Sequence, residues 1–327
     1  MKKNGPDRAR TAAVLMLFFL AIAATAGTDT VPPVPAASCR AGLRSSPYGP
    51  RHGFPAPAYW LAAARSMASA FTRAAPVLVW IVGTMERAPA ASEEKGYSGR
   101  VLLSFPAPAG GAACANIVFA PRDVNEAYLE QFDRNGFQVW LQVEPGNADV
   151  DTLIRLALGR YARHPCVIGF GVDVEWHCWS RQNSAGIKIT DAQAEAWSQS
   201  VRSFNPRYQL FLKHWLAARM PPTYRRGLVF INDSQRFASF AQMLKHFEQW
   251  GKNFAPAPVG FQFGYPADRG WWQRLANPAQ DIGKALLSRL PNASDLIWVD
   301  FTMEEIWSPA ICQTDPVCAI LSPQGAK

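Results

Sequence analysis

The stretch 167–179, VIGFGVDVEWHCW, carries the side chains best suited to chemistry. Successive side chains of a β-strand point to opposite faces, so a strand here places Asp173 and Glu175 on one face and only apolar side chains on the other. Gly169 and Gly171 precede the two acids on their face and predict room for a ligand. Carboxyl groups are costly to bury, and crowding is expected to raise the pKa of at least one of them. This pattern favours general acid–base chemistry.

Further along the chain, short apolar, β-branched runs alternate with helical patterns. The predicted strands are 77–82, 116–120, 137–143, 167–175, 208–213, 228–232, 259–263 and 296–301. The predicted helices are 58–73, 124–135, 149–163, 190–204, 237–250 and 278–290. This rhythm predicts an α/β fold of the irregular (β/α)₈ barrel (TIM) type. The alternative is an open, doubly wound sheet, which the lack of Gly-x-Gly-x-x-Gly after the first predicted strand disfavours.

Residues 84–113 contain no clear helix, and 213–228 hold at most one short helix. Both segments fit the barrel rhythm poorly.

Polar side chains follow most of the predicted strands at the same end. Because parallel strands bring their carboxyl ends to one mouth, we expect these side chains to converge there. The candidates are Gln142, Glu144, Asp173, Glu175, Lys213, Asn232, Asp233, Gln262, Tyr265 and Asp300. Trp80, Trp176 and Trp298 are the expected aromatic surfaces among twelve tryptophans. An acid beside a carboxylate is the equipment for cleaving glycosidic bonds, and aromatic rings offer flat faces to sugars.

The end of the stretch resembles the fourth strand of chitinase-like and endo-β-N-acetylglucosaminidase-like glycoside hydrolases. Their motif is Asp-x-x-Asp-x-Asp-x-Glu, of which Asp173 and Glu175 match the last two positions, while Ile168 and Gly171 occupy the earlier aspartate positions. The Asp-x-Glu pair is also similar to that of muramidase-type barrels. The resemblance implies a glycoside hydrolase barrel.

In such a barrel, Glu175 would protonate the leaving oxygen, and Asp173 would steady a substrate N-acetyl group that attacks the anomeric carbon. The same resemblance gives Tyr265 or Asn232 the task of holding that acetamide. In a second variant Asp300 attacks directly, and Glu144 is the next candidate as base, nucleophile or ligand of sugar hydroxyls.

Structural roles remain open for several of these acids. Asp173 and Glu175 could form a structural pair with Lys213. Glu144 could cap the helix that begins near Asp149, and Asp233 could simply start a helix. At the level of function, the alternatives are a non-catalytic carbohydrate-binding barrel and a metal-assisted deacetylase.

The sequence also argues against several classes of protein. It has no P-loop, no Gly-x-Ser-x-Gly and no His-Glu-x-x-His, and its five histidines are scattered. We therefore expect no cofactor and no metal, although carboxylate oxygens leave calcium or magnesium open. The net charge of +8 comes without a basic cluster beyond the first ten residues, which disfavours nucleic-acid binding. The expected partner is a polysaccharide; the sugar, the linkage and the oligomeric state are not determined.

The N-terminus predicts export. Basic residues, an apolar run at 12–24 and Ala24-Thr25-Ala26 predict a signal peptide over 1–26, with secretion or periplasmic location and no lasting membrane insertion. A Pro/Ala/Ser-rich linker or arm is expected over 27–57, the barrel over 58–310 and a tail over 311–327. Six cysteines in an exported chain favour disulfides, with Cys312 and Cys318 closing a short loop. Cys166 and Cys178 flank one strand and are not expected to pair.

Overall fold

The structure is a computed structural model that describes residues 39–50, 52–88, 96–110, 113–308 and 310–311. Its strands are β1 (Arg40–Ser45), β2 (Ala75–Arg87), β3 (Tyr97–Leu103), β4 (Ile117–Phe119), β5 (Gln138–Val143), β6 (Val167–Asp173), β7 (Gln209–Lys213), β8 (Leu228–Asn232), β9 (Val259–Phe263) and β10 (Ala293–Val299). Its α-helices are α1 (Pro57–Ser69), α2 (Glu126–Arg134), α3 (Val150–Tyr161), α4 (Asp191–Phe204), α5 (Phe240–Phe254), α6 (Arg269–Trp272), α7 (Pro278–Arg289) and α8 (Met303–Ile306). Short 3₁₀ turns are η1 (Val174–Trp176), η2 (Ala217–Arg219), η3 (Pro266–Asp268) and η4 (Asp300–Thr302).

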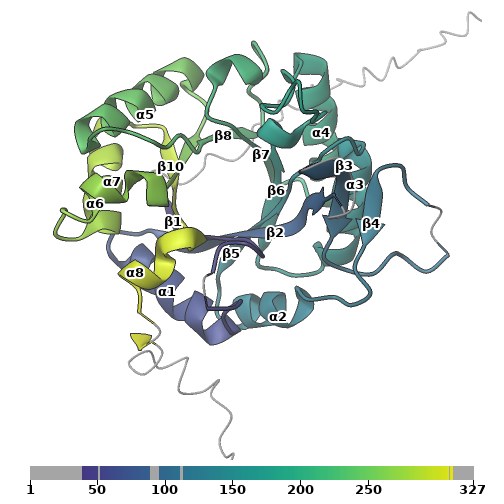
Figure 1. The fold of residues 1–327 in the computed structure, drawn as a ribbon, viewed down its shortest axis with the longest axis horizontal. Helices are drawn as coiled ribbons and strands as arrows, with labels where there is room; N and C mark the ends of the chain where they lie inside the picture. The colour runs from purple at the N-terminus through teal and green to yellow at the C-terminus, as the bar shows by residue number, and fades with distance from the viewer. Residues whose placement is uncertain (1–38, 51, 89–95, 111–112, 309, 312–327) are drawn as a thin grey trace, which may run out of the picture. The chain divides into compact units, whose positions relative to one another are not determined.

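The described strands form one sheet that closes on itself. The order is β1-β10-β9-β8-β7-β6-β5-β2-β3-β4, and a further pairing of β1 with β2 completes a ring of eight parallel strands among the described residues. Figure 1 looks into this ring, with the helices around its outside. The predicted TIM-type barrel is therefore confirmed.

The first strand of the ring lies inside the segment predicted to be a linker. Residues Arg40–Ser45 pair in parallel with both β10 and β2, so the barrel begins near residue 40 and not at 58. The prediction failed because this strand carries two arginines between Pro- and Ser-rich flanks. Both arginines are compensated in the barrel, since Arg40 pairs with Asp295 and Arg44 pairs with Asp300.

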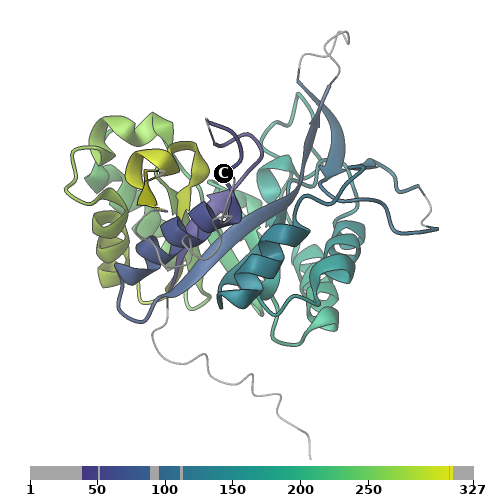
Figure 2. The ribbon, with the colours of Figure 1, turned by 90° about the horizontal axis from the view of Figure 1, so that it is seen from below.

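The predicted strand 116–120 exists as β4, but it lies outside the ring. Strand β2 is 13 residues long and continues beyond its pairing with β5, where β3 pairs antiparallel to it and β4 adds to β3. Figure 2 shows β2 rising out of the barrel together with β3. Residues 84–113 thus contribute strands where no helix was evident, and the connection from β7 to β8 contains the short turn η2, which fits the expectation of at most one short helix.

Local capping explains where the main helices begin. Thr190 and Gln193 form a reciprocal capping box at α4, and Asp149 caps α3 by accepting the backbone N–H of Thr152 at 2.8 Å. Ser239 caps α5 in the same way. No described helix has the length and apolar character needed to cross a membrane.

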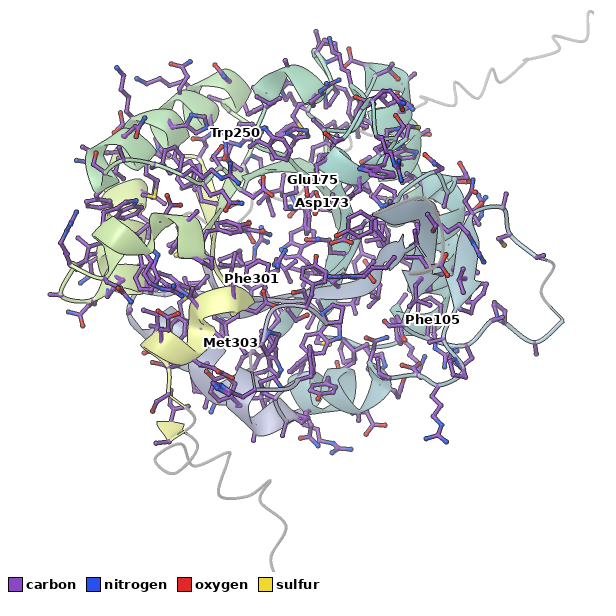
Figure 3. All side chains as sticks on the ribbon, in the orientation of Figure 1. Phe105, Asp173, Glu175, Trp250, Phe301 and Met303 are labelled. Atoms are coloured by element: carbon purple, nitrogen blue, oxygen red, sulfur yellow. The ribbon has the colours of Figure 1, made fainter. Side chains whose placement is uncertain are left out.

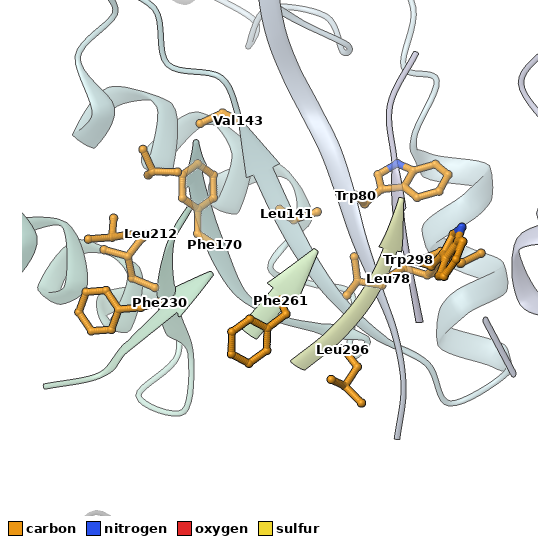
Figure 4. Close-up of a cluster of buried hydrophobic side chains, with 14 of the residues drawn as sticks. Leu78, Trp80, Leu141, Val143, Phe170, Leu212, Phe230, Phe261, Leu296 and Trp298 are labelled. Atoms are coloured by element: carbon orange, nitrogen blue, oxygen red, sulfur yellow. The ribbon is translucent and has the colours of Figure 1, made fainter. Parts of the chain in front are cut away.

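Two apolar layers hold the barrel together. Outward-facing side chains of the strands pack under the helices, as Figure 4 shows for Leu78, Phe170 and Phe261. A smaller cluster fills the inside of the ring: Val77, Val79, Trp140, Phe211, Val229, Ile231 and Ile297, with Ile168 packed against it. The inner cluster closes the lower part of the barrel, so a ligand site has to lie at the carboxyl ends of the strands.

The predicted signal peptide and the pair Cys312–Cys318 lie outside the described residues. Among the described residues, Cys39, Cys166 and Cys178 form no disulfide.

Candidate active site

A cavity of about 680 Å³ opens above the inner cluster, at the carboxyl ends of the strands. Acidic, basic and aromatic side chains from most strands of the ring form its wall. They include Arg44, Tyr48, Tyr97, Glu144, Asp173, Glu175, Trp176, Lys213, Trp215, Asp233, Tyr265 and Phe301. Figure 3 shows Asp173 and Glu175 over the centre of the ring, away from Trp250 among the outer helices. Four of the predicted acids, Glu144, Asp173, Glu175 and Asp233, thus converge on this cavity.

Lys213 joins two of these acids. Asp173 and Lys213 are partners in the register of β6 and β7, and the Lys213 Nζ lies 2.7 Å from Asp173 Oδ2. The same ammonium donates to Asp233. Burial alone would lower the pKa of Lys213, but Asp173 and Asp233 raise it well above its usual value. Asp233 does not cap α5, because Ser239 does.

Asp173 is buried, and Lys213 is the cation in contact with its carboxylate. Burial raises its pKa to about 7, Lys213 opposes this effect, and Asp233 and Glu144 add to it. Its Oδ1 has no hydrogen-bond partner within the described part of the chain. Asp173 is therefore held in place by Lys213 and remains available to a ligand group or to a shared proton.

Glu175 lies two residues after the end of β6. The strand ends at Asp173, and Glu175 sits in turn η1, so the predicted alternation of 167–175 stops two residues early. Oxygens of Asp173, Glu175 and Asp233 nevertheless lie within 4.8 Å of one another. Burial and the neighbouring Asp173 carboxylate raise the pKa of Glu175 well above its usual value. Half-buried and without an ion pair to any described residue, Glu175 is suited to holding a proton at neutral pH.

Glu144 faces the same cavity. It accepts hydrogen bonds from the Tyr48 hydroxyl and, at 2.8 Å, from the backbone N–H of Met85. Burial raises its pKa, and the hydrogen bond from Tyr48 opposes this effect. Glu144 is not a helix cap, since Asp149 caps α3.

Asp300 lies behind the cavity wall. Its carboxylate accepts hydrogen bonds from Arg44 Nη2 at 3.1 Å and from Ser46 Oγ at 2.7 Å, and it is not among the residues that line the cavity. Burial raises its pKa, and Arg44 opposes this effect. The structure therefore does not bring Asp300 to a substrate; it holds Arg44, which does line the cavity.

Two of the three predicted tryptophans point away from the site. Trp80 and Trp298 are buried in the outer apolar layer, where their indole N–H groups donate to Asn125 and Thr302. The expectation that they offer faces to a sugar is wrong, because they occupy outward positions of their strands. Trp176 does line the cavity, with its ring centroid 4.9 Å from that of Tyr97.

The predicted amide side chains are likewise outside the cavity wall. Gln142 and Gln262 are fully buried, and the Gln262 carbonyl accepts a hydrogen bond from the Tyr265 hydroxyl at 3.4 Å. Asn232 is turned toward α5, where its amide nitrogen lies 3.5 Å from His246. Among the predicted acetamide ligands, only Tyr265 faces the cavity.

The glycines of β6 serve the core and not a ligand. Val139 pairs with Val167 and Trp140 with Gly169, so Ile168 is an extra residue that bulges toward the inner cluster. A Cβ on Gly169 would collide with Trp140 and the carbonyl of Gln209, and one on Gly171 with the ring of Phe211. The prediction that these glycines leave space for a ligand is therefore wrong, since aromatic rings fill that space.

Several wall residues were missed by sequence reasoning. Arg44 and Tyr48 belong to the supposed linker, and Tyr97 belongs to the strand β3 that was not predicted. Trp215 had a usable signal, because it follows Lys213 by two residues at a strand end. Phe301 had one as well, since it ends the predicted strand 296–301.

The acids could also be considered as metal ligands. Asp173, Glu175 and Asp233 are close enough to share a divalent ion, but Lys213 already places its ammonium against two of them. An ion would have to displace that ammonium, so the donor set fits a lysine-neutralised acid cluster better than a metal centre.

Comparison with known proteins gives structural likenesses only. No protein-family model matches the sequence, and no curated protein is similar to it. An endo-1,4-β-mannanase from Eisenia fetida aligns with a TM-score of 0.46 and 10% identity over 81% of this chain and 85% of its own. A psychrophilic family 10 endo-β-1,4-xylanase aligns with a TM-score of 0.36 and 8% identity over 80% of this chain and 86% of its own.

Glucuronidases match a smaller part of the fold. The β-D-glucuronidase of Dictyoglomus thermophilum aligns with a TM-score of 0.37 and 13% identity over 55% of this chain and 37% of its own. The chain spans 26% to 37% of the length of the β-glucuronidases that it matches.

Proposed function

We propose that this chain is an exported glycoside hydrolase in which Glu175 is the general acid. The observation that carries the proposal is the placement of Glu175 in the cavity with a raised pKa, beside the lysine-bound carboxylate of Asp173. A protonated carboxyl next to an ionised one is the arrangement that glycosidic bond cleavage requires.

In this proposal each residue of the cavity wall has its own role in the reaction. Glu175 gives its proton to the leaving glycosidic oxygen, while Asp173, oriented by Lys213, stabilises positive charge at the anomeric carbon or a substrate group that attacks it. Glu144 and Tyr265 face the same space and are available to sugar hydroxyls. Trp176, Tyr97 and Trp215 supply aromatic faces along the wall.

The separation of the acids bears on stereochemistry. Inverting enzymes hold their two carboxyl groups roughly 6.5–9.5 Å apart to admit a water molecule, and retaining enzymes about 5–5.5 Å apart. One oxygen each of Glu175, Asp173 and Asp233 lies within 4.8 Å of the others, which is nearer to the retaining separation than to the inverting one. We therefore expect products that retain the anomeric configuration, which proton NMR of the first released sugars will show. Initial formation of the opposite anomer would exclude Asp173 and Asp233 as the partners of Glu175.

The main test is Glu175→Gln. Removing a general acid costs ~10²–10⁴-fold in turnover, and the isosteric amide keeps the shape of the cavity. We expect sugar release from a polysaccharide panel to fall by that factor, while retention on the immobilised glycan persists. Glu195→Gln, at an exposed position of α4, is the matched control. If the unaltered protein binds a glycan but releases no sugar from any of them, the chain is a carbohydrate-binding barrel and not a hydrolase.

A further inference from the structure

A serine and a histidine that glycoside cleavage does not use also face the cavity. Ser234 is the second residue after β8, and His246 lies on α5, so the β8–α5 connection brings them together. Ser234 Oγ lies 2.8 Å from His246 Nε2, and both residues line the 680 Å³ cavity. This is the separation at which an imidazole can take the proton of a nucleophilic hydroxyl.

Asn232 lies beside this pair and favours one direction of its hydrogen bond. Its Oδ1 accepts the backbone N–H of Ser234 at 2.8 Å, so its amide Nδ2 is the atom that lies 3.5 Å from His246 Nε2. Because Nδ2 can only donate, its approach favours the tautomer in which Nε2 is the unprotonated, accepting nitrogen of the ring. The Ser234 hydroxyl therefore donates to Nε2, which is the direction needed for a general base.

The surroundings keep this base neutral and its nucleophile positioned. Partial burial lowers the pKa of His246, so the imidazole remains uncharged at neutral pH. Arg236, two residues after Ser234, has a φ of 68°, a conformation that non-glycine residues rarely adopt and that recurs at functional turns.

We propose that Ser234 and His246 form a nucleophile–base pair that hydrolyses a carboxylic ester on the ligand in this cavity, an O-acyl group of a glycan being the fitting class. Ser234 Oγ forms a bond to the ester carbonyl carbon and its proton passes to His246 Nε2. The alkoxide leaves with that proton, and water then attacks the acyl-serine through the same histidine, releasing the acid and restoring the hydroxyl. The sequence lacks the Gly-x-Ser-x-Gly turn, so this pair is not visible as a motif.

The experiment uses a fluorophosphonate probe and p-nitrophenyl acetate on the full-length protein. The probe forms a bond from Ser234 Oγ to phosphorus with loss of fluoride, and peptide mass spectrometry identifies the labelled residue. We expect labelling at Ser234 in the unaltered protein, its absence in Ser234→Ala, and a loss of ~10²–10⁴-fold in acetate release in His246→Gln. Ser203→Ala, at an exposed position of α4, is the matched control.

The readouts separate a chemical role from a structural one. Gln at position 246 can still hydrogen-bond the serine but cannot take its proton, so a merely structural contact predicts normal labelling and rates in His246→Gln. That result, or the absence of label on Ser234 in the unaltered protein, would overturn the proposal. No glycan bond is cleaved in either assay, so the outcome is independent of the proposed glycosidase function.

Discussion

The charge balance of the cavity depends on Lys213. Four acids line the wall, namely Glu144, Asp173, Glu175 and Asp233, and Lys213 is the cation that contacts two of them. Removing one partner of a buried ion pair leaves an uncompensated charge, which costs roughly 3–5 kcal/mol. Lys213→Met is therefore expected to lower the free energy of unfolding by about that amount, measured by urea denaturation at neutral pH. Lys245→Met, at an exposed position of α5, is the control; equal stability of the two variants would contradict the assigned role of Lys213.

The raised pKa of Glu175 makes a prediction about stability and pH. The folded protein holds this proton at pH values where an unfolded glutamate, with a pKa of about 4.3, has lost it. The folded state therefore binds more protons, and its free energy of unfolding falls as pH rises above about 4.3 until the raised pKa is passed. Gln at position 175 does not titrate and escapes this loss.

We expect the stability of Glu175→Gln relative to the unaltered protein to increase steadily from pH 5 to pH 8, measured by urea denaturation at each pH. His177, His214 and His246 have lowered pKa values and oppose the trend below about pH 6.5. They are present in both proteins, so their effect cancels in the difference. A difference that is flat with pH would mean that Glu175 has an ordinary pKa.

At the scale of elements, strand β6, which ends at Asp173, packs closely against β7. Gly171 faces Phe211 of β7, and a side chain at 171 would occupy the space of that ring. Gly171→Ala is expected to destabilise the protein by ~1–3 kcal/mol through overpacking. The pair Gly171→Ala with Phe211→Leu should recover part of this loss, because a smaller side chain leaves room for the methyl group. Thermal denaturation of both variants and of Phe211→Leu alone tests this, and failure of the rescue would place the strain elsewhere.

The sequence was most informative where a charged residue directly follows a buried strand. The strand-end acids Glu144, Asp173 and Asp233 were found because charge after a buried strand needs a partner or a ligand. It failed for Trp80 and Trp298, because a buried strand is apolar on both faces and its pattern does not tell inward from outward positions. The bulge at Ile168 shifts the alternation of inward and outward side chains along β6 by one residue. Neither this bulge nor the turn at Glu175 changes the hydrophobic pattern of the sequence, so neither could be predicted.

At the scale of the whole molecule, the barrel rhythm was predictable but the strand that closes the ring was not. Strand β1 reads as polar and isolated because its partners, Asp295 and Asp300, lie more than 250 residues away. The predicted count of eight was reached by including β4, which lies outside the ring. The predicted number of strands was therefore correct although β1 was missing from it and β4 was counted in error. Local sequence patterns do not show which strands pair with each other.

Closure by β1 predicts how much of the N-terminal segment the fold requires. A chain that begins at residue 58 lacks β1, so the edges of β10 and β2 are unpaired and Asp295 and Asp300 are buried without Arg40 and Arg44. Each lost ion-pair partner costs roughly 3–5 kcal/mol, and domains of this kind have only ~5–15 kcal/mol in total. We therefore expect this chain to show no cooperative thermal transition and to bind a hydrophobic dye. A chain that begins at residue 38 keeps β1 and both arginines and is expected to melt as the full-length protein does. Cooperative melting of the shorter chain would show that the ring does not need β1 to fold.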